Sequence, residues 1–241
     1  GMTESAPSAM FVNSIDVKAG DIGAPVPGMT LKLVPVDGKT EVRYRGPNVP
    51  PGYWRSDAAT RDAFDEEGYL CTGDAVQWID PNNIHRGLKF DGRIAEDFKL
   101  STGTFVSVGP MRAKAIMAGS PYVQDVVLTG LNMKEVGALI FPTPACREVS
   151  GLGADASMNE VLASTPVRQR IQAIIDQLAR ESTGSASRIA RDLVLAEPPS
   201  PVLGEITDKG SVNQRAVLKH RAALVDALHD GSATGIYTPQ A

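Results

Sequence analysis

The sequence predicts a mixed α/β chain in which a small β-rich domain, residues 1–91, precedes an α+β domain, residues 92–241. Up to about residue 90, turn residues separate short strand-like runs, which is typical of a β-domain. After residues 91–93, strand-like runs alternate with helical patterns, so we place the domain boundary there. The 241 residues, 42% hydrophobic and 22% charged, suffice for one large domain or two modest ones.

Short strands and loops are expected in the first domain. Residues 31–34 and 41–44 alternate between apolar and polar on either side of Asp37-Gly38. This pair favours positive φ, so the pattern predicts a β-hairpin. A short acidic helix that includes residues 65–68 is expected to lead into the strand-like residues 69–72.

The second domain is expected to alternate strands with helices. Ser211 with Gln214 three residues later forms a capping-box pattern that predicts the start of a last helix. The elements before it are a hairpin over residues 99–107, a helix over 110–118, strands over 122–130 and 136–142, a helix opening at Thr165-Pro166 and a strand over 191–196.

Composition and charge exclude several classes of function. A net charge of −4 creates no global field toward nucleic acid or anionic lipid, so neither is expected as a partner. The longest apolar stretches are too short to span a bilayer. The first residues lack the basic flank and apolar core of a secretion signal, and Cys71 and Cys146 do not make a disulfide framework. We therefore expect a cytoplasmic protein.

Some apparent motifs carry no chemistry. Gly38-Lys39-Thr40 would need a glycine at position 33 to form a phosphate loop, and Leu33 stands there. Residues 151–156 resemble a dinucleotide fingerprint, but no buried strand is predicted before them. The three histidines lie apart from both cysteines and lack ligand spacing, so no transition-metal site is expected.

Two segments of the first domain are candidates for binding a nucleotide. Residues 69–74 end with Gly73, which allows close approach of a ligand, and Asp74, whose carboxylate can accept hydrogen bonds from the two hydroxyls of a ribose. Arg93 could serve the same sugar or a phosphate. The alternatives are a turn with a capping aspartate and an ordinary surface arginine.

The chain start and one loop lysine are further candidates. Thr3 and Glu4 could hold a phosphate oxygen and Mg²⁺, the alternative being a solvated loop. Lys209 stands two residues before a predicted helix N-terminus, where the helix dipole disfavours a cation unless an anion is present. Lys209 is therefore a candidate for an anion site.

Taken in order, these segments resemble the adenylate-forming acyl-CoA and aryl-CoA synthetases of the AMP-binding superfamily. The segments that carry the resemblance are 1–4 (Gly-x-Thr-Glu), 45–55, 69–74 (Thr-Gly-Asp, for ribose), 90–103 (the junction of the large and small domains) and 204–209 (the catalytic lysine). Within the family, residues 98–106 and 208–215 are most similar to feruloyl-CoA synthetases.

The resemblance implies a fold and an activity. Residues 1–91 would be the C-terminal remnant of the large AMP-binding domain, a distorted barrel-like β-subdomain, and residues 92–241 a mobile α+β lid. The parent enzyme would activate an aromatic, hydroxycinnamate-like acid with ATP and pass the acyl group to CoA. The residues implied are catalytic Lys209, cofactor-binding Thr3, Glu4, Asp74, Arg93 and Gly103, and Glu4 as ligand of Mg²⁺.

Two positions depart from the family pattern. Ala95 stands where the family usually has a hinge Asp or Lys, and Lys209 precedes Gly210 whereas the family order is Gly then Lys. Lys219 therefore remains an alternative catalytic lysine. We favour Lys209 because a loop cation can reach an active site, whereas Lys219 is expected on a helix surface.

The length of the chain leaves two alternative functions. The resemblance covers less than half of a complete family member, and the phosphate-gripping loop is expected before Gly1. The chain alone is thus expected to be inactive, and an isolated fragment that binds nucleotide or CoA weakly, or only associates with partners, is the alternative. Exposed β-domain surface could then cause self-association. The adenylation part of a carboxylic acid reductase would require carrier and reductase segments after residue 230.

Overall fold

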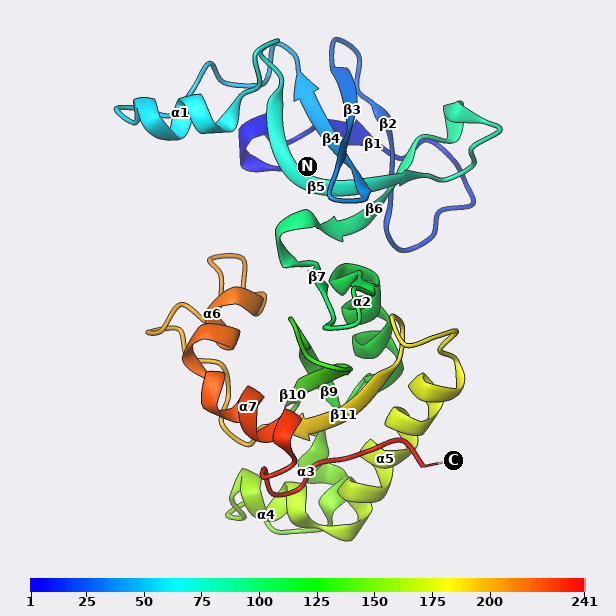
Figure 1. The fold of residues 1–241 in the computed structure, drawn as a ribbon, viewed down its shortest axis with the longest axis vertical. Coiled ribbons are helices and arrows are strands. Elements are labelled where there is room, and N and C mark those ends of the chain that lie inside the picture. Colours follow the sequence, from blue (N-terminus) through cyan, green and yellow to red (C-terminus); the bar gives the residue numbers. More distant parts are fainter. Residues whose placement is uncertain (241) are drawn as a thin grey trace. The chain divides into compact units, whose positions relative to one another are not determined.

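The computed structural model describes residues 1–240, which form two compact units, Gly1–Ala95 and the chain from Glu96 onward (Figure 1). The first unit is built on a six-stranded sheet and the second is α+β, so the predicted fold class is confirmed. Among these residues, no helix combines the length and apolar character needed to cross a bilayer.

A curled, antiparallel half-barrel sheet with strand order β1-β2-β6-β5-β4-β3 forms the first unit. Its buried core includes Val42, Tyr44, Val76 and Leu88. The strands are β1 (Met10–Phe11), β2 (Asp21–Pro25), β3 (Thr30–Val36), β4 (Lys39–Arg45), β5 (Leu70–Trp78) and β6 (Leu88–Arg93), and short 3-10 turns lie at η1 (Thr3–Ser5), η2 (Ile84–Arg86) and η3 (Ile94–Glu96).

The predicted hairpin in this sheet is confirmed, whereas the predicted acidic helix is wrong. Strands β3 and β4 pair up to Val36 and Lys39, and both residues of the Asp37-Gly38 turn have positive φ, 48° and 83°. Residues 65–68 form a turn, and the helix α1 (Asp57–Ala63) ends before them. The carboxylate of Asp65 accepts hydrogen bonds from the amides of Glu67 and Tyr69, which favours the turn over a helix.

The second unit encloses a three-stranded sheet between two layers of helices (Figure 1). Strand β10 (Val136–Pro142) lies in the centre, antiparallel to β9 (Val123–Thr129) and parallel to β11 (Ile189–Val194). The parallel connection passes through α3 (Ala145–Ser150), α4 (Met158–Ala163) and α5 (Thr165–Arg180). Ahead of the sheet stand a small hairpin, β7 (Phe98–Lys99) and β8 (Phe105–Val106), and α2 (Val108–Gly119).

Side chains of alternate residues fill the two sides of this sheet. On one side Val126, Leu128 and Ile140 pack with residues of α2 and α5. On the other side Val127 and Leu139 pack with residues of α6 (Gln214–His220) and α7 (Ala222–Asp230). Strands buried on both faces read as continuous apolar runs, as β9 and β10 do.

The last helix differs from its prediction in two ways. It is divided into α6 and α7, and Arg221 stands between them with its guanidinium turned to other partners. The capping box at Ser211 does not form. Instead the side chain of Asn213 caps α6 by accepting a hydrogen bond from the amide of Ala216, and the Ser211 hydroxyl lies 2.8 Å from that of Thr207.

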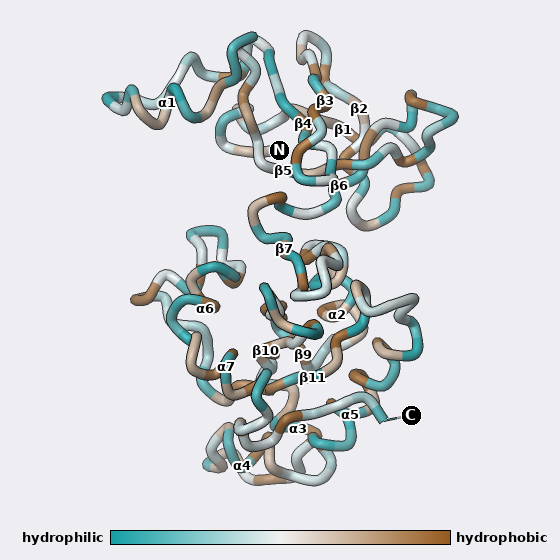
Figure 2. The backbone as a smooth tube through the Cα atoms, viewed as in Figure 1, coloured by the Kyte–Doolittle hydropathy of each residue, from teal (hydrophilic) through white to brown (hydrophobic). Residues whose placement is uncertain are grey.

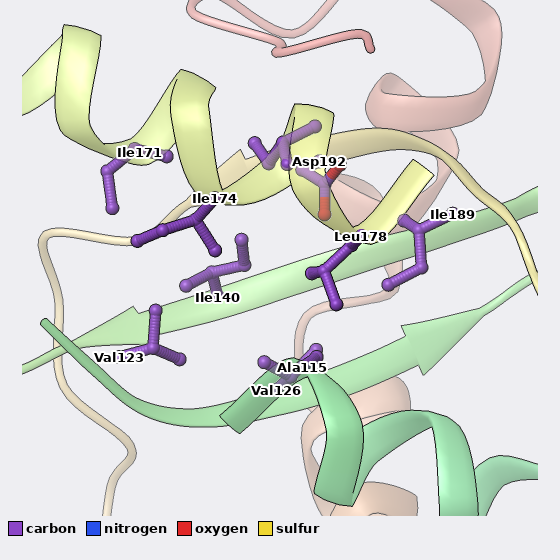
Figure 3. Close-up of a pocket in the computed structure, with 10 residues that line it drawn as sticks. Ala115, Val123, Val126, Ile140, Ile171, Ile174, Leu178, Ile189 and Asp192 are labelled. Atoms are coloured by element: carbon purple, nitrogen blue, oxygen red, sulfur yellow. The ribbon is translucent and has the colours of Figure 1, made fainter. Parts of the chain in front are cut away.

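One carboxyl group is buried among apolar side chains between the sheet and α5. Asp192 of β11 lines a cavity with Val126, Ile140 and Leu178, among others, and the cavity has room for at most about one water molecule (Figure 3). Its Oδ2 has no hydrogen-bond partner within residues 1–240. Burial raises the pKa of Asp192 to about 8, so the group is neutral at physiological pH.

This aspartate makes stability depend on pH. In the unfolded chain its carboxyl ionises near pH 4, whereas in the folded chain it holds its proton to about pH 8. Between these values the folded state binds one more proton, so the free energy of unfolding falls as pH rises, by at most about 1.4 kcal/mol per pH unit. In Asp192→Asn this contribution is expected to vanish, as measured by urea denaturation at pH 5, 6 and 7.

The exposed Asp226 of α7 provides a matched control. Asp226→Asn should keep the pH dependence of the unmodified chain. Equal slopes in the unmodified chain and in Asp192→Asn would contradict the assignment of a buried, neutral carboxyl.

Candidate nucleotide and lysine sites

Two of the predicted residues, Asp74 and Arg93, lie side by side on neighbouring strands. They are directly opposite each other in the register of β5 and β6, and Arg93 Nε is 3.6 Å from Asp74 Oδ1. The Arg93 side chain is 65% exposed and that of Asp74 27% exposed. A carboxylate and a guanidinium at the edge of solvent can together contact hydroxyl groups and an anion.

A cavity of about 220 Å³ adjoins Asp74 in the first unit. Its other walls are mainly apolar and include Met10, Tyr44, Val76 and Phe90. Burial, together with the negative charge of Asp74, raises the pKa of Tyr44 to about 12, so its hydroxyl remains a hydrogen-bond donor. Sequence reasoning missed Tyr44, because alternation along β4 marks it only as a core residue.

The start of the chain lies at the same cavity, because Met2 forms part of its wall. Thr3 and Glu4 belong to the short turn η1, and Glu4 Oε1 accepts a hydrogen bond of 3.1 Å from the hydroxyl of Tyr53. Within residues 1–240, no group of three His, Cys, Asp or Glu side chains could hold a metal ion. Glu4 could supply a single carboxylate, which fits Mg²⁺ that is bound mainly through phosphates and water.

Gly103 lies at the exposed tip of the hairpin in the second unit. Its φ of 81° suits glycine, its amide bonds to the carbonyl of Leu100, and no atom outside its chain neighbours lies within 4 Å of where a Cβ would stand. The loop between β9 and β10 holds the hairpin, since Ser101 N donates to Met133 O and Asn132 N donates to Lys99 O. The hairpin is thus an anchored element with an open tip.

Lys209 is exposed in a tight turn of the second unit. The turn is closed by hydrogen bonds of 2.8 Å from Thr207 N to Ser211 O and from Gly210 N to Thr207 O. No described residue forms a hydrogen bond or an ion pair with the Lys209 ammonium. Lys219 is also exposed and lies on α6. Two arginine–carboxylate pairs hold the ends of this turn, Arg112–Asp125, which is partly buried, and Arg221–Glu205, which is buried. They were not predicted, because no local sequence pattern connects their members.

Comparison with known proteins gives a consistent result. Residues 98–233 match the model of the AMP-binding enzyme C-terminal domain. Human long-chain-fatty-acid–CoA ligase 1 is 30% identical over 193 residues, 76% of this chain and 27% of the ligase. A long-chain-fatty-acid–CoA ligase of Mycobacterium tuberculosis is 27% identical over 219 residues, 89% of this chain and 35% of the ligase.

Solved structures with the same fold include two adenylating enzymes. The adenylation domain of the carboxylate reductase of Mycobacterium chelonae has a TM-score of 0.69 and 25% identity, covering 87% of this chain and 32% of that domain. The o-succinylbenzoate CoA synthetase of Bacillus subtilis, solved with its acyl-adenylate, has a TM-score of 0.61 and 18% identity. The match covers 91% of this chain and 40% of the synthetase. The latter likeness supports the fold alone.

This chain spans about a third of the length of these proteins. The family model nevertheless covers more than half of the chain, including the hairpin with Gly103 and the turn with Lys209. The chain therefore belongs to the AMP-binding enzyme C-terminal domain family and corresponds to a C-terminal portion of the acyl-CoA ligase superfamily.

Proposed function

We propose that this chain supplies the C-terminal part of an AMP-forming acid–thiol ligase. In the first step a carboxylate oxygen of the acid attacks the α-phosphorus of ATP, and the bond to the β-phosphate breaks to release pyrophosphate. In the second step the sulfur of CoA attacks the acyl carbon, and AMP leaves. The observation that carries the proposal is an exposed Lys209, without an ion-pair partner among residues 1–240, on a hydrogen-bonded turn within the family-matched region.

Lys209 has the properties of an electrostatic catalyst for the first step. Its charge is displayed at the tip of a turn whose backbone is already hydrogen-bonded, so little reorganisation is needed when it meets an anion. Negative charge develops on the oxygens around the α-phosphorus as the acid attacks. A fixed ammonium group there stabilises this transition state more than the ground state.

Lys209→Ala should therefore separate the two steps. In the protein expressed from the complete open reading frame, acid-dependent formation of the adenylate should slow by on the order of 10², as for the loss of one pre-organised charge donor. Thioester formation from preformed acyl-adenylate and CoA should stay near its normal rate. Both rates are measurable by rapid quench with labelled ATP or adenylate.

Lys219→Ala provides the control, because Lys219 is an exposed lysine of the same unit. It should leave both steps unchanged. If Lys219→Ala slowed adenylation and Lys209→Ala did not, the lysine would have been assigned to the wrong position. Equal losses in both steps for Lys209→Ala would indicate a structural lysine.

Asp74 and Arg93 are proposed to hold the ribose of the nucleotide. The carboxylate can accept hydrogen bonds from two neighbouring hydroxyls, and the exposed guanidinium next to it can contact the sugar or a phosphate. Thr3 and Glu4 are proposed to contact phosphate, with Glu4 as a ligand of Mg²⁺. The metal would neutralise phosphate charge when bound.

Asp74→Ala should weaken nucleotide binding. Hydrogen bonds to a charged group contribute about 1.5 to 3 kcal/mol each, so AMP affinity should fall by about tenfold or more. Isothermal titration of the complete protein with AMP measures this. Asp62→Ala removes an exposed aspartate of α1 and should bind AMP normally. Unchanged affinity in Asp74→Ala would contradict the assignment of Asp74 to the ribose and leave it as a residue of strand β5.

Two steps with different reacting groups require two arrangements of the second unit. We place the hinge in residues 91–97, where β6 ends and the short turn η3 follows. Rotation there would exchange Lys209 for the hairpin, and Gly103 would let the pantetheine arm of CoA pass close to the backbone. Ala95, which replaces the usual hinge residue of the family, has an exposed side chain.

A hinge of this kind should be accessible to proteases. Limited proteolysis of the chain should cut first within residues 91–97, because a segment that changes its dihedral angles samples extended states. Mass spectrometry of the first fragments identifies the site. The exposed loop over residues 151–155 is the internal comparison. First cleavage in that loop, with residues 91–97 protected, would count against the hinge.

The adenylation part of a carboxylate reductase is a second candidate function, which differs from the ligase in the group that accepts the acyl chain. Likeness to the Mycobacterium chelonae domain favours the adenylation part of a carboxylate reductase, in which an acceptor other than free CoA takes the acyl group. Adenylate that is consumed only when CoA is added favours the ligase.

The acid substrate is a separate question. Residue similarity favours a hydroxycinnamate, whereas the relatives named above are long-chain fatty-acid ligases. Competing ferulate against palmitate in pyrophosphate release separates the two.

A further inference from the structure

The turn that carries Lys209 is tied down at both of its ends. We call residues 205–213 the Lys209 loop. Its tip, residues 208–211, is exposed, whereas Glu205 and Val212 on its two sides are 1% and 4% exposed. Ile206 and Val212 form a β-bridge that closes the base. The loop therefore has a buried base and an exposed tip.

The first end of the loop is held by an ion pair with Arg221. Arg221 Nε and Nη2 donate to the two oxygens of Glu205 at 3.0 and 2.7 Å, and these bonds hold the pKa of Glu205 below its ordinary value. The same carboxylate accepts a hydrogen bond of 2.7 Å from the amide of Ser200. Arg221 also donates to the carbonyls of Glu197 and Pro198. This pair therefore anchors the loop over residues 197–200 as well as the Lys209 loop.

The second end is held by a different pair, Arg112 of α2 and Asp125 of β9. Arg112 Nε and Nη2 donate to the two oxygens of Asp125, both at 2.7 Å. From this pair, Arg112 Nη2 donates at 2.8 Å to the carbonyl of Val212, and the amide of Val212 donates at 3.3 Å to Asp125. The pair thus binds both the backbone carbonyl and the backbone amide of Val212, at the end of the Lys209 loop.

The arginine of this second pair also connects the Lys209 loop to the hairpin with Gly103. Arg112 lies in the second turn of α2, which begins at Val108 directly after the hairpin. The amide of Val108 is capped by Asp97, just before the hairpin. The helix therefore joins the two elements that the proposed function uses in turn.

We propose that Arg112, paired with Asp125, is the positioning residue of Lys209. It holds the second end of the Lys209 loop through Val212 and so fixes the backbone that carries the Lys209 side chain. This inference rests on the proposed function of Lys209. Bidentate geometry is essential to the role, because a lysine at position 112 keeps the charge but replaces the two nitrogens that bind Asp125 and Val212 with a single nitrogen on a flexible stem.

The matched control is Arg191, an arginine in the same unit with similar bonds. It pairs with Glu135 and donates to the carbonyls of Leu228 and His229, and it makes no contact with the Lys209 loop. Arg112→Lys and Arg191→Lys each replace an arginine that donates two hydrogen bonds to a carboxylate, and each keeps the charge; the two bonds of Arg191 both go to Glu135 Oε1. Only the first should affect the Lys209 loop.

The first measurement is amide hydrogen exchange of the chain itself. In Arg112→Lys, exchange within residues 205–213 should become about tenfold faster, because the base of the loop opens more often. Arg191→Lys should exchange there as the unmodified chain does. Asp125→Asn disrupts the same pair from the other side and should repeat the pattern of Arg112→Lys, which keeps the test valid if one variant folds poorly.

The second measurement compares the two half-reactions in the complete protein. Arg112→Lys should slow adenylate formation by about tenfold and leave thioester formation within about twofold, because only the first step uses Lys209. A structural defect would slow both steps together. Arg191→Lys should change neither.

The outcomes distinguish this inference from the function on which it rests. Unchanged exchange in Arg112→Lys, or equally fast exchange of the loop in Arg191→Lys, would overturn the anchoring. Faster exchange with normal adenylation, while Lys209→Ala slows adenylation, would overturn the positioning role. Normal adenylation in Lys209→Ala would refute the proposed function itself, whatever the exchange shows.

Discussion

Burial of the β9-β10-β11 sheet on both faces is the constraint from which the second unit follows. A three-stranded sheet offers two apolar faces, and each must be covered to remain folded in water. Helices α2 and α5 cover one face, and α6 and α7 cover the other. The loops with functional interest, the hairpin and the Lys209 loop, each adjoin one of these helices. Their positions are therefore consequences of how the sheet is covered. Figure 2 shows the hydropathy of each residue along the backbone of these segments.

Carboxyl groups in the interior of the second unit differ in whether they have hydrogen-bond donors. The carboxylates of Asp125 and Glu205 each accept two hydrogen bonds from an arginine, and backbone amides donate to their further lone pairs. Asp192 Oδ2 has no hydrogen-bond donor in the described part of the chain, and burial keeps the carboxyl neutral by raising its pKa to about 8. A buried pair adds little stability relative to an apolar pair, but breaking one is costly. Glu205 lies at one end of the Lys209 loop, and Asp125 of β9 accepts a hydrogen bond from Val212 at the other end, so both pairs hold this loop in place.

How much could be predicted depended on whether a signal was local. The hairpin around Asp37-Gly38 follows from the turn chemistry of two residues, and α5 follows from apolar spacing over four turns, so both were predicted. The acidic residues 65–68 and the capping box at Ser211 carry equally plausible local signals. They were misread because Asp65 binds backbone amides and Asn213 takes the capping position.

The candidate site residues also divide into those with a local sequence signal and those without one. Asp74, Arg93 and Lys209 could be named from short motifs, since each motif lies within a few residues of the chain. Arg112 could not, because it acts on Val212 across 100 residues of sequence and no local pattern connects them. A catalytic cation needs an exposed tip to meet its substrate and a rigid base to meet it in one place. A short motif identifies the exposed tip with Lys209, whereas the contacts that hold the base of the loop arise from tertiary packing and have no local sequence pattern.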